Sequence, residues 1–256
     1  MANVGKTFTI YRGPSLIDGT PIVVWFQQGS KNNKTGGMAQ TFIQADGLHS
    51  DNIGKDVSPL AMSRSGGDKS YCGDCVHRGT PNDKDKGQAT NRTCYVLLMY
   101  APTSKHNAYM RGSYKERLGH ANLVDLGRDQ LIRLGAFGDP SAVPSYVWES
   151  LLQESAGRTG YTHAKRNPMP SSLMSSADTL TQARGMWERG ERTFRVTNDL
   201  KDIVKGKEII CPASHEAGQK TTCDKCKLCS GNAINAKSIV IKAHGTSAKK
   251  YTGVPA

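Results

Sequence analysis

Residues 130–163 read QLIRLGAFGDPSAVPSYVWESLLQESAGRTGYTH, and this stretch decides the predicted fold class. Its first part, QLIRLGAFGDP (130–140), is an apolar run that ends in a glycine, an acid and a proline, which predicts a buried strand and a turn. The stretch 143–156 repeats apolar residues at helical spacing, and TGYTH (159–163) has the pattern of a short strand. A strand, a helix and a strand in this order predict a βαβ unit and a parallel sheet.

The alternation extends beyond this unit in both directions. We predict further strands at 94–101, 172–178, 192–197, 208–214 and 237–245, and a helix at 179–190. The first 70 residues are β-rich, with short runs at 7–11, 21–26 and 38–43. About seven strands fit an α/β fold with a partial or complete β/α (TIM-like) barrel. We therefore predict a β-rich N-terminal segment, 1–70, packed on a Cys-rich barrel-like domain, 71–256; an open α/β sheet is the alternative.

Polar residues follow most of the predicted strands. Because active sites of β/α barrels and ligand crevices of open sheets both lie at the carboxyl ends of strands, these residues are expected at one edge. Asp139 and His163 are the candidate catalytic acid–base residues. Turn capping by Asp139 and structural hydrogen bonding by His163 are the alternatives. The full set of strand-end residues is Asp139, His163, Asp178, Thr197, Asn198, Cys211 and His244.

The late cysteines form the pattern C-x11-C-x2-C-x2-C, and Pro212 follows the first of them. Consecutive C-x2-C-x2-C spacing with a remote Cys-Pro is typical of [4Fe–4S] ferredoxins. A zinc site made of four thiolates is the alternative, although such sites more often use two separated C-x2-C pairs. The predicted ligands are Cys211, Cys223, Cys226 and Cys229.

The early cysteines, Cys72, Cys75 and Cys94, form C-x2-C-x18-C. Three thiolates can hold a [4Fe–4S] cluster that has one open iron, which would be a catalytic arrangement. Alternatively, His77 completes a zinc site of three thiolates and one imidazole. The chain has seven cysteines and no apparent secretion signal, so metal ligation is favoured over a disulfide framework. Either site could also serve only to hold loops together.

The formal net charge is +12 and the sequence pI is about 9.4. A charge of this size attracts polyanions, so nucleic acid is a candidate partner; a generally basic surface is the alternative. No apolar run approaches the length that spans a membrane, and residues 1–13 contain no apolar signal region. We therefore expect no membrane association and a cytoplasmic location. The sequence does not indicate an oligomeric state.

Several blocks together resemble an uncharacterised family of bacteriophages and mobile elements: SYCGDCVHRG, TCYV, RLGAFGDPSAVP, TGYTH, RTFRVT, CPAS, TTCDKCKLCSG and SIVIKAHG. A more distant resemblance is to phage proteins that look like radical S-adenosylmethionine (SAM) enzymes, which pair an early C-x3-C-x2-C-Y with a late Cys-Pro and C-x2-C-x2-C. This resemblance implies one or two [4Fe–4S] clusters, SAM as a cofactor, and contact of the Gly138-Asp139 turn with its methionyl amine.

The present sequence departs from that pattern because eighteen residues, instead of two, separate Cys75 from Cys94. The expected function is an iron–sulfur-binding protein with a radical-SAM-like barrel, either enzymatic or degenerate, acting in the cytoplasm of a bacterial host. One alternative is a basic protein, its fold held together by zinc or a cluster, that binds nucleic acid without catalysis. Another is a virion or assembly component.

Overall fold

The computed structural model describes residues 5–252, whose strands form two sheets. The six-stranded sheet has the order β4-β1-β2-β3-β5-β6 and the five-stranded sheet has the order β10-β11-β9-β8-β7. The strands of the first sheet are β1 (Thr7–Pro14), β2 (Pro21–Gln27), β3 (Ala39–Ala45), β4 (Lys115–Glu116), β5 (Leu131–Phe137) and β6 (Gly157–Thr159). Those of the second are β7 (Tyr161–Thr162), β8 (Met174–Ala177), β9 (Thr193–Thr197), β10 (Glu208–Ile210) and β11 (Ser238–Lys242).

The pairings from β3 onward are parallel, and the short edge strand β4 also pairs in parallel with β1. β3 pairs in parallel with β5, and β5 with β6, while all four pairings of the second sheet are parallel. The N-terminal strands add an antiparallel β1–β2–β3 meander, in which β2 is fully buried at Ile22–Phe26. Because β2 lies between β1 and β3 and its side chains are buried on both faces, the continuous apolar run IVVWF suits this position.

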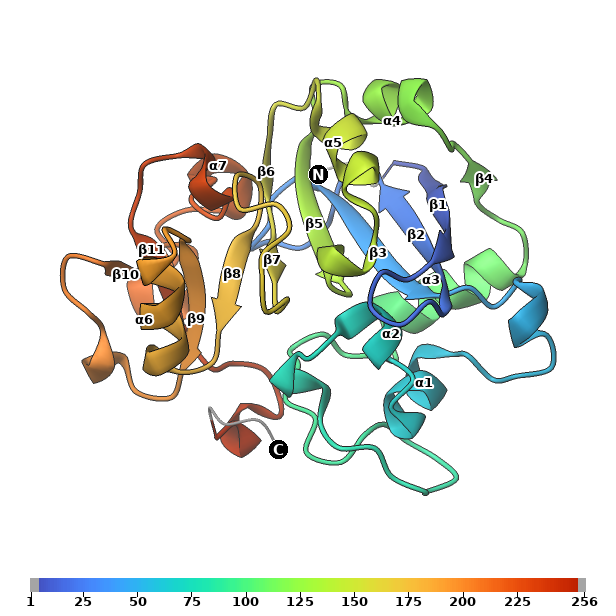
Figure 1. Cartoon of the computed structure of the whole chain (residues 1–256), viewed down its shortest axis with the longest axis horizontal. Coiled ribbons are helices and arrows are strands. Elements are labelled where there is room, and N and C mark those ends of the chain that lie inside the picture. The colour runs from blue at the N-terminus through green and yellow to red at the C-terminus, as the bar shows by residue number, and fades with distance from the viewer. Residues whose placement is uncertain (1–4, 253–256) are drawn as a thin grey trace.

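The two sheets meet at Gly160, which separates β6 from β7 by a single residue (Figure 1). A Cβ atom at this position would lie 2.6 Å from the side chain of Leu173, so only glycine allows the close approach. The Gly160 N–H donates to the carbonyl oxygen of Cys229 at 3.0 Å, and its own carbonyl accepts from Met174 N–H at 3.0 Å. One chain segment therefore continues from the first sheet into the second.

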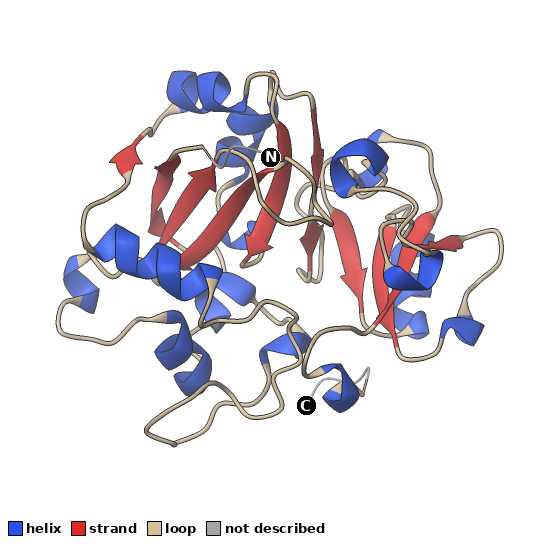
Figure 2. Cartoon of the chain, turned by 180° about the vertical axis from the view of Figure 1, so that it is seen from behind, coloured by secondary structure: helices blue, strands red, loops and turns tan. Residues whose placement is uncertain are grey.

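The helices are α1 (Pro59–Ser65), α2 (Lys69–Cys72), α3 (Ala101–Met110), α4 (His120–Gly127), α5 (Ser145–Leu152), α6 (Leu180–Glu188) and α7 (Cys223–Cys226). Short 3-10 helices lie at Ser50–Asn52, Val76–Arg78, Pro140–Ala142, Leu200–Asp202, His215–Ala217, Gly231–Ala233 and Ala248–Lys250. Helix α3 lies across the lower part of the six-stranded sheet (Figure 2), where Tyr109 packs on Trp25 with ring centroids 5.2 Å apart. Among residues 5–252, none of the helices combines the length and apolar character that crossing a bilayer requires.

The predicted strand at 94–101 is wrong, since the structure has turns there and then the start of α3. Most of its large apolar side chains are exposed, with Met99 at 67% and Tyr100 at 64%, whereas Leu98 is buried. The guanidinium of Arg92 donates to the carbonyl oxygens of Cys94 and Val96, which removes these acceptors from any strand ladder. Pro102 then occupies the first turn of α3, where proline favours a helix start.

The predicted α/β class is confirmed by this mixture of parallel strands and helices. The predicted β-rich segment 1–70 supplies β1, β2 and β3, and these strands belong to the same sheet as β5 and β6. The Gly- and Ser-rich stretch 63–75 contains the end of α1 and all of α2. Helix α1 starts at Pro59 after the N-cap Ser58 and ends at Gly66, whose φ of 81° suits a glycine C-cap.

Candidate functional site

A cavity of about 600 Å³ is lined by residues from both sheets and by all seven cysteines. Strands β3, β5, β7, β8, β9 and β11 contribute to its wall. Several of the predicted strand-end residues also line it, namely Asp139, His163, Asp178, Cys211 and His244. Thr197 and Asn198 are not among the lining residues; the Asn198 amide instead donates to the carbonyl oxygen of Tyr251.

The eighteen residues between Cys75 and Cys94 form a loop whose two ends are hydrogen-bonded to each other, which brings the early cysteines together. Thr80 and Thr90 exchange two backbone hydrogen bonds of 2.8 Å, and the N–H groups of Thr93 and Cys94 both donate to the carbonyl oxygen of His77. Gly79 has a φ of 81°, and a Cβ atom there would lie 2.4 Å from the Thr90 carbonyl oxygen. The inserted residues therefore form a loop that leaves and returns at one place, so Cys94 lies beside the Cys72–Cys75 turn.

A buried ion pair frames this turn. Arg78 donates from Nε and Nη2 to one carboxylate oxygen of Asp68, at 2.9 and 2.6 Å, and donates further to the carbonyl oxygens of Gly66 and Gly73. Although burial raises the pKa of the Asp68 carboxyl, the hydrogen bond from Arg78 opposes that rise. The Arg78 side chain thereby ties the end of α1 to the first two cysteines.

The early thiols lie close enough for their charges to interact. Burial raises the pKa of Cys72 well above its usual range, and Asp68, Cys75 and Cys94 raise it further. Burial also raises the pKa of Cys94, against the lowering effect of Arg92, and Cys75 adds to the rise. A bound cation would reverse these effects, because it stabilises thiolates.

The late cysteines lie against the five-stranded sheet in largely apolar surroundings. Cys211 is 7% exposed and packs in one cluster with Met174, Ile239 and Ile241, while Cys223 and Cys229 lie against the same cluster. Burial raises the pKa of the Cys229 thiol to about 12, and the hydrogen bond with the Tyr161 side chain opposes this. All seven cysteines are free thiols.

The late loop is anchored to the first sheet through its backbone. The N–H of Cys223 donates to the carbonyl oxygen of Lys34 at 2.9 Å, and the carbonyl of Cys229 accepts from Gly160. Cys211 N–H donates to the carbonyl oxygen of Val240, which extends the β10–β11 ladder by one bond. These bonds hold the C-x2-C-x2-C segment over the junction of the sheets.

Arg133 is a buried cation on the cavity wall between the two cysteine groups. It is 8% exposed, and its Nη2 donates to the Tyr95 hydroxyl at 2.7 Å, while its guanidinium lies 5.4 Å from the centre of the Tyr161 ring. Burial lowers the pKa of Arg133, but Tyr95, Tyr161 and the thiols of Cys223 and Cys229 raise it above its ordinary value. The sequence reasoning missed this residue, although an arginine within an apolar strand run was a usable signal.

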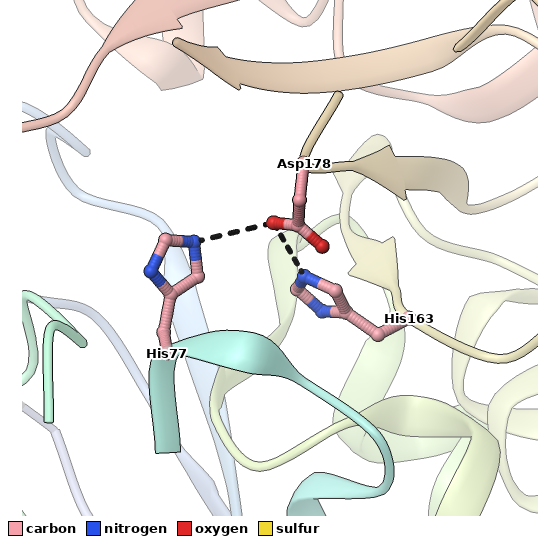
Figure 3. Close-up of side chains that lie close together, drawn as sticks. All are labelled: His77, His163 and Asp178. Atoms are coloured by element: carbon pink, nitrogen blue, oxygen red, sulfur yellow. Dashed lines mark ion pairs between the residues drawn. The ribbon is translucent and has the colours of Figure 1, made fainter. Parts of the chain in front are cut away.

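His77, His163 and Asp178 form a compact trio at the edge of the same cavity (Figure 3). The Nε2 atoms of His77 and His163 lie 3.6 and 3.7 Å from one carboxylate oxygen of Asp178. Burial lowers the pKa of His77 to about 4, whereas Cys75 and Asp178 overcome the effect of burial on His163 and raise its pKa well above the usual value. The Nδ1 of His77, on the other side of the ring, lies 2.9 Å from the Thr93 hydroxyl.

The carboxylate of Asp139 is engaged by backbone groups. Its Oδ1 accepts from Ser141 N–H at 2.9 Å and its Oδ2 accepts from His163 N–H at 2.6 Å. This favours the turn-capping interpretation of Asp139 over the catalytic one. Gly138, whose φ is 85°, sits so close to Ile43 and to the Tyr71 carbonyl that no side chain would fit.

Two further histidines, His215 and His244, are not members of this trio. His244 lines the cavity and stacks on Tyr95 with ring centroids 5.5 Å apart, and burial lowers its pKa. His215 is exposed and is not part of the cavity wall.

Comparison of the chain with family models gave no match, and comparisons with curated proteins and with solved structures gave none either. The resemblance to phage proteins therefore stays a prediction. Nucleic-acid binding also stays a prediction, since it rests on the net charge of +12 alone.

Proposed function

We propose that the chain is an iron–sulfur protein in which two [4Fe–4S] clusters face one cavity, with a radical-SAM-like division of roles. The early group, Cys72, Cys75 and Cys94, would hold a cluster with one open iron. The late group would hold an auxiliary cluster through four thiolates, which are those of Cys211, Cys223, Cys226 and Cys229. The parallel strands from β3 to β10 would correspond to the partial barrel of such proteins.

The observation that carries this proposal is the convergence of all seven cysteines on a single cavity wall. They come from distant parts of the sequence, and the closure of the loop between His77 and Cys94 compensates for the unusual gap. A [4Fe–4S] cluster with one open iron needs three thiolate ligands, and a fully ligated cluster needs four. The two cysteine groups match these numbers.

Among the described residues, no three cysteine sulfur atoms lie as close together as the ligands of a single zinc ion would. Four thiolates around one zinc ion, at about 2.3 Å from it, lie roughly 3.8 Å apart. Within the described residues, the trio in Figure 3 is the only group of three or more Cys, His, Asp or Glu donors within 4.8 Å of one another. The thiolates of a [4Fe–4S] cluster each bind a different iron, so they are held further apart than the ligands of one ion.

The surroundings also suit negatively charged clusters. Arg133 supplies a fixed positive charge close to Cys223 and Cys229, and Lys34 lowers the pKa of Cys211 and Cys223, against the larger effect of burial. Low exposure and nearby donors are among the features by which a protein tunes cluster potential.

A [4Fe–4S] cluster with an open iron supplies one-electron chemistry to a ligand bound at that iron, and SAM is the co-substrate that the resemblance implies. In this chain the cavity wall would exclude water from that ligand. The Gly138-Asp139 turn would contribute backbone groups rather than a free carboxylate, because both oxygens of Asp139 already accept hydrogen bonds.

Anaerobic purification and reconstitution, followed by iron and acid-labile sulfide analysis, tests the proposal. We expect about eight iron and about eight sulfide per chain, and a broad absorption band near ~400 nm. The triple variant Cys72→Ala/Cys75→Ala/Cys94→Ala should retain about half of both, provided that circular dichroism shows an intact fold. SAM cleavage with a reductant should occur in the wild-type chain and not in this variant.

A colourless protein that contains zinc and no sulfide would overturn the iron–sulfur proposal. Clusters without SAM binding or cleavage would restrict the proposal to a degenerate relative that retains the metal centres. Salt-dependent nucleic-acid binding together with zinc alone would favour the non-enzymatic alternative.

A further inference from the structure

We infer that His77, His163 and Asp178 form a site for one divalent first-row transition-metal ion, which lies beside Cys75 but uses no cysteine as a donor. The three donor atoms lie within 4.8 Å of one another, and they come from the 3-10 helix after Cys75 and from the ends of β7 and β8. Figure 3 shows both imidazoles turned toward the same carboxylate oxygen. This inference does not depend on the nature of the centres that the cysteines hold.

The Asp178 carboxylate supplies the strongest argument. Its side chain is 5% exposed, and its Oδ1 is buried without a hydrogen-bond partner. Burial of an unpaired carboxylate oxygen is costly, so such an atom in a native structure calls for a ligand.

The distances suit an ion better than hydrogen bonds. Separations of 3.6 and 3.7 Å between Nε2 and Oδ1 exceed the range of a hydrogen bond. Two ligands bound at about 2.0–2.2 Å to a tetrahedral ion lie roughly 3.3–3.6 Å apart. Both histidine–aspartate separations are thus within a few tenths of an ångström of those around one ion, and the two imidazole nitrogens lie within 4.8 Å of each other.

Neighbouring groups hold the donors in place, as outer-shell partners do in metal sites. The Nδ1 of His77 lies 2.9 Å from the Thr93 hydroxyl, and its ring stacks on Tyr251 with centroids 4.9 Å apart. The Tyr251 hydroxyl donates to the carbonyl oxygen of Asp178 at 3.1 Å. The backbone N–H of His163 is fixed by Asp139. The site is thus built before any ion binds.

Two imidazoles and one carboxylate are the donor set of non-haem Fe(II) sites with open positions, and of three-ligand zinc sites whose fourth position is open. The trio lines the cavity, so the remaining positions face the space that the early cysteines share. A small ligand in this space could therefore contact the ion directly.

Mn²⁺ is a selective probe for this site, because nitrogen and oxygen donors accept it while thiolates favour softer metals. Titration of the anaerobically purified full chain, followed by the loss of the free Mn²⁺ electron paramagnetic resonance signal, should give about one bound ion. Asp178→Asn keeps the shape of the side chain and should weaken binding at least tenfold. His244→Gln, which changes another histidine of the same cavity, should leave it within twofold.

The early-cysteine triple variant separates this inference from the proposed function. Retained Mn²⁺ binding in that variant would support an independent site, and lost binding with an intact fold would overturn it. Absence of Mn²⁺ binding in the wild-type chain, or equal binding by wild type and Asp178→Asn, would also overturn it. Iron and sulfide contents are measured on the same samples, so a failure here leaves the iron–sulfur result unaffected.

Discussion

Cys72, Cys75 and Cys94 lie in a region framed by charged side chains, whereas the four later cysteines lie against apolar side chains of the five-stranded sheet. The Asp68–Arg78 pair holds the early turn, and Arg92 binds the carbonyl of Cys94. The late group instead packs on one cluster that includes Met174 and Ile241. If the proposed clusters are present, this contrast predicts that the late one mainly supports the fold, whereas the early one lies in a more polar and less stable region.

The largest effect is expected from loss of a late ligand. Cys211→Ala should remove about half of the bound iron and lower the free energy of unfolding by about 4 kcal/mol, because metal loss and an apolar cavity coincide. This corresponds to a fall of about 10 °C in melting temperature. Iron analysis and thermal unfolding under anaerobic conditions measure both quantities.

Cys94→Ala is the matched variant of the early group. It should also remove about half of the iron, but its loss of stability should be less than half of that of Cys211→Ala. Equal losses of stability in the two variants would show that the two groups do not differ in the proposed way.

The next largest loss of stability is expected when the Asp68–Arg78 ion pair beside the early cysteines is broken. Arg78→Met should cost about 3 kcal/mol, because it leaves the carboxylate of Asp68, 7% exposed, without its cation. Asp68→Asn in the same chain should restore part of that loss, since the uncompensated charge is then removed. A double-mutant cycle by urea unfolding measures the coupling; additive effects would contradict the importance of this pair.

The closure of the eighteen-residue loop is tested by two glycines with positive φ. Gly79→Ala should be more destabilising than Gly87→Ala by about 2 kcal/mol, because a Cβ at Gly79 meets the Thr90 carbonyl while one at Gly87 meets nothing within 4 Å. The φ values of 81° and 92° make the backbone strain similar in both. Hydrogen exchange of the Cys94 amide would report the opening of the loop, and equal exchange in the two variants would argue against this closure.

The sequence predicted most strands because their apolar patterns are local. It failed at 94–101, where apolar side chains such as Leu97 line the cavity or face outward, and where Arg92 takes the carbonyl groups that a strand would use. Helix α3 was missed because its buried face includes Lys105 and His106, which leaves no apolar stripe to recognise. Packing against the sheet, rather than an amphipathic pattern, places this helix.

The candidate site was predictable only in its composition. Cysteine spacing identified the seven candidate thiols, and strand ends pointed to Asp139, His163 and Asp178. The pairing of His77 with Asp178 could not be foreseen, because it requires the 73–93 segment to fold across the ends of β7 and β8. The buried position of Arg133 likewise depends on the second sheet, which forms from residues later in the chain.

The smallest expected effect concerns Lys105 of α3, which tests whether a buried charge lowers stability where this helix packs on the six-stranded sheet. Its ammonium lies 4.6 Å from the centre of the Phe42 ring, and burial lowers its pKa to about 8. Below pH 8 the group is charged in both folded and unfolded chains, so the folded state bears the full cost of desolvation. Between pH 8 and about 10.4 the folded chain loses its proton first, and stability rises with pH.

Lys105→Met should therefore stabilise the chain by about 1 kcal/mol at pH 7, and this advantage should shrink by pH 10. Urea unfolding of the wild type and the variant at both pH values measures the difference between their free energies of unfolding. The contributions of all other titrating groups cancel in this difference. If Lys105→Met is instead less stable at pH 7, the attraction between the ammonium and the aromatic rings outweighs desolvation. Burial of a charged group against the six-stranded sheet would then not reduce stability, which would weaken the expectation that the charged side chains around the early cysteines do so.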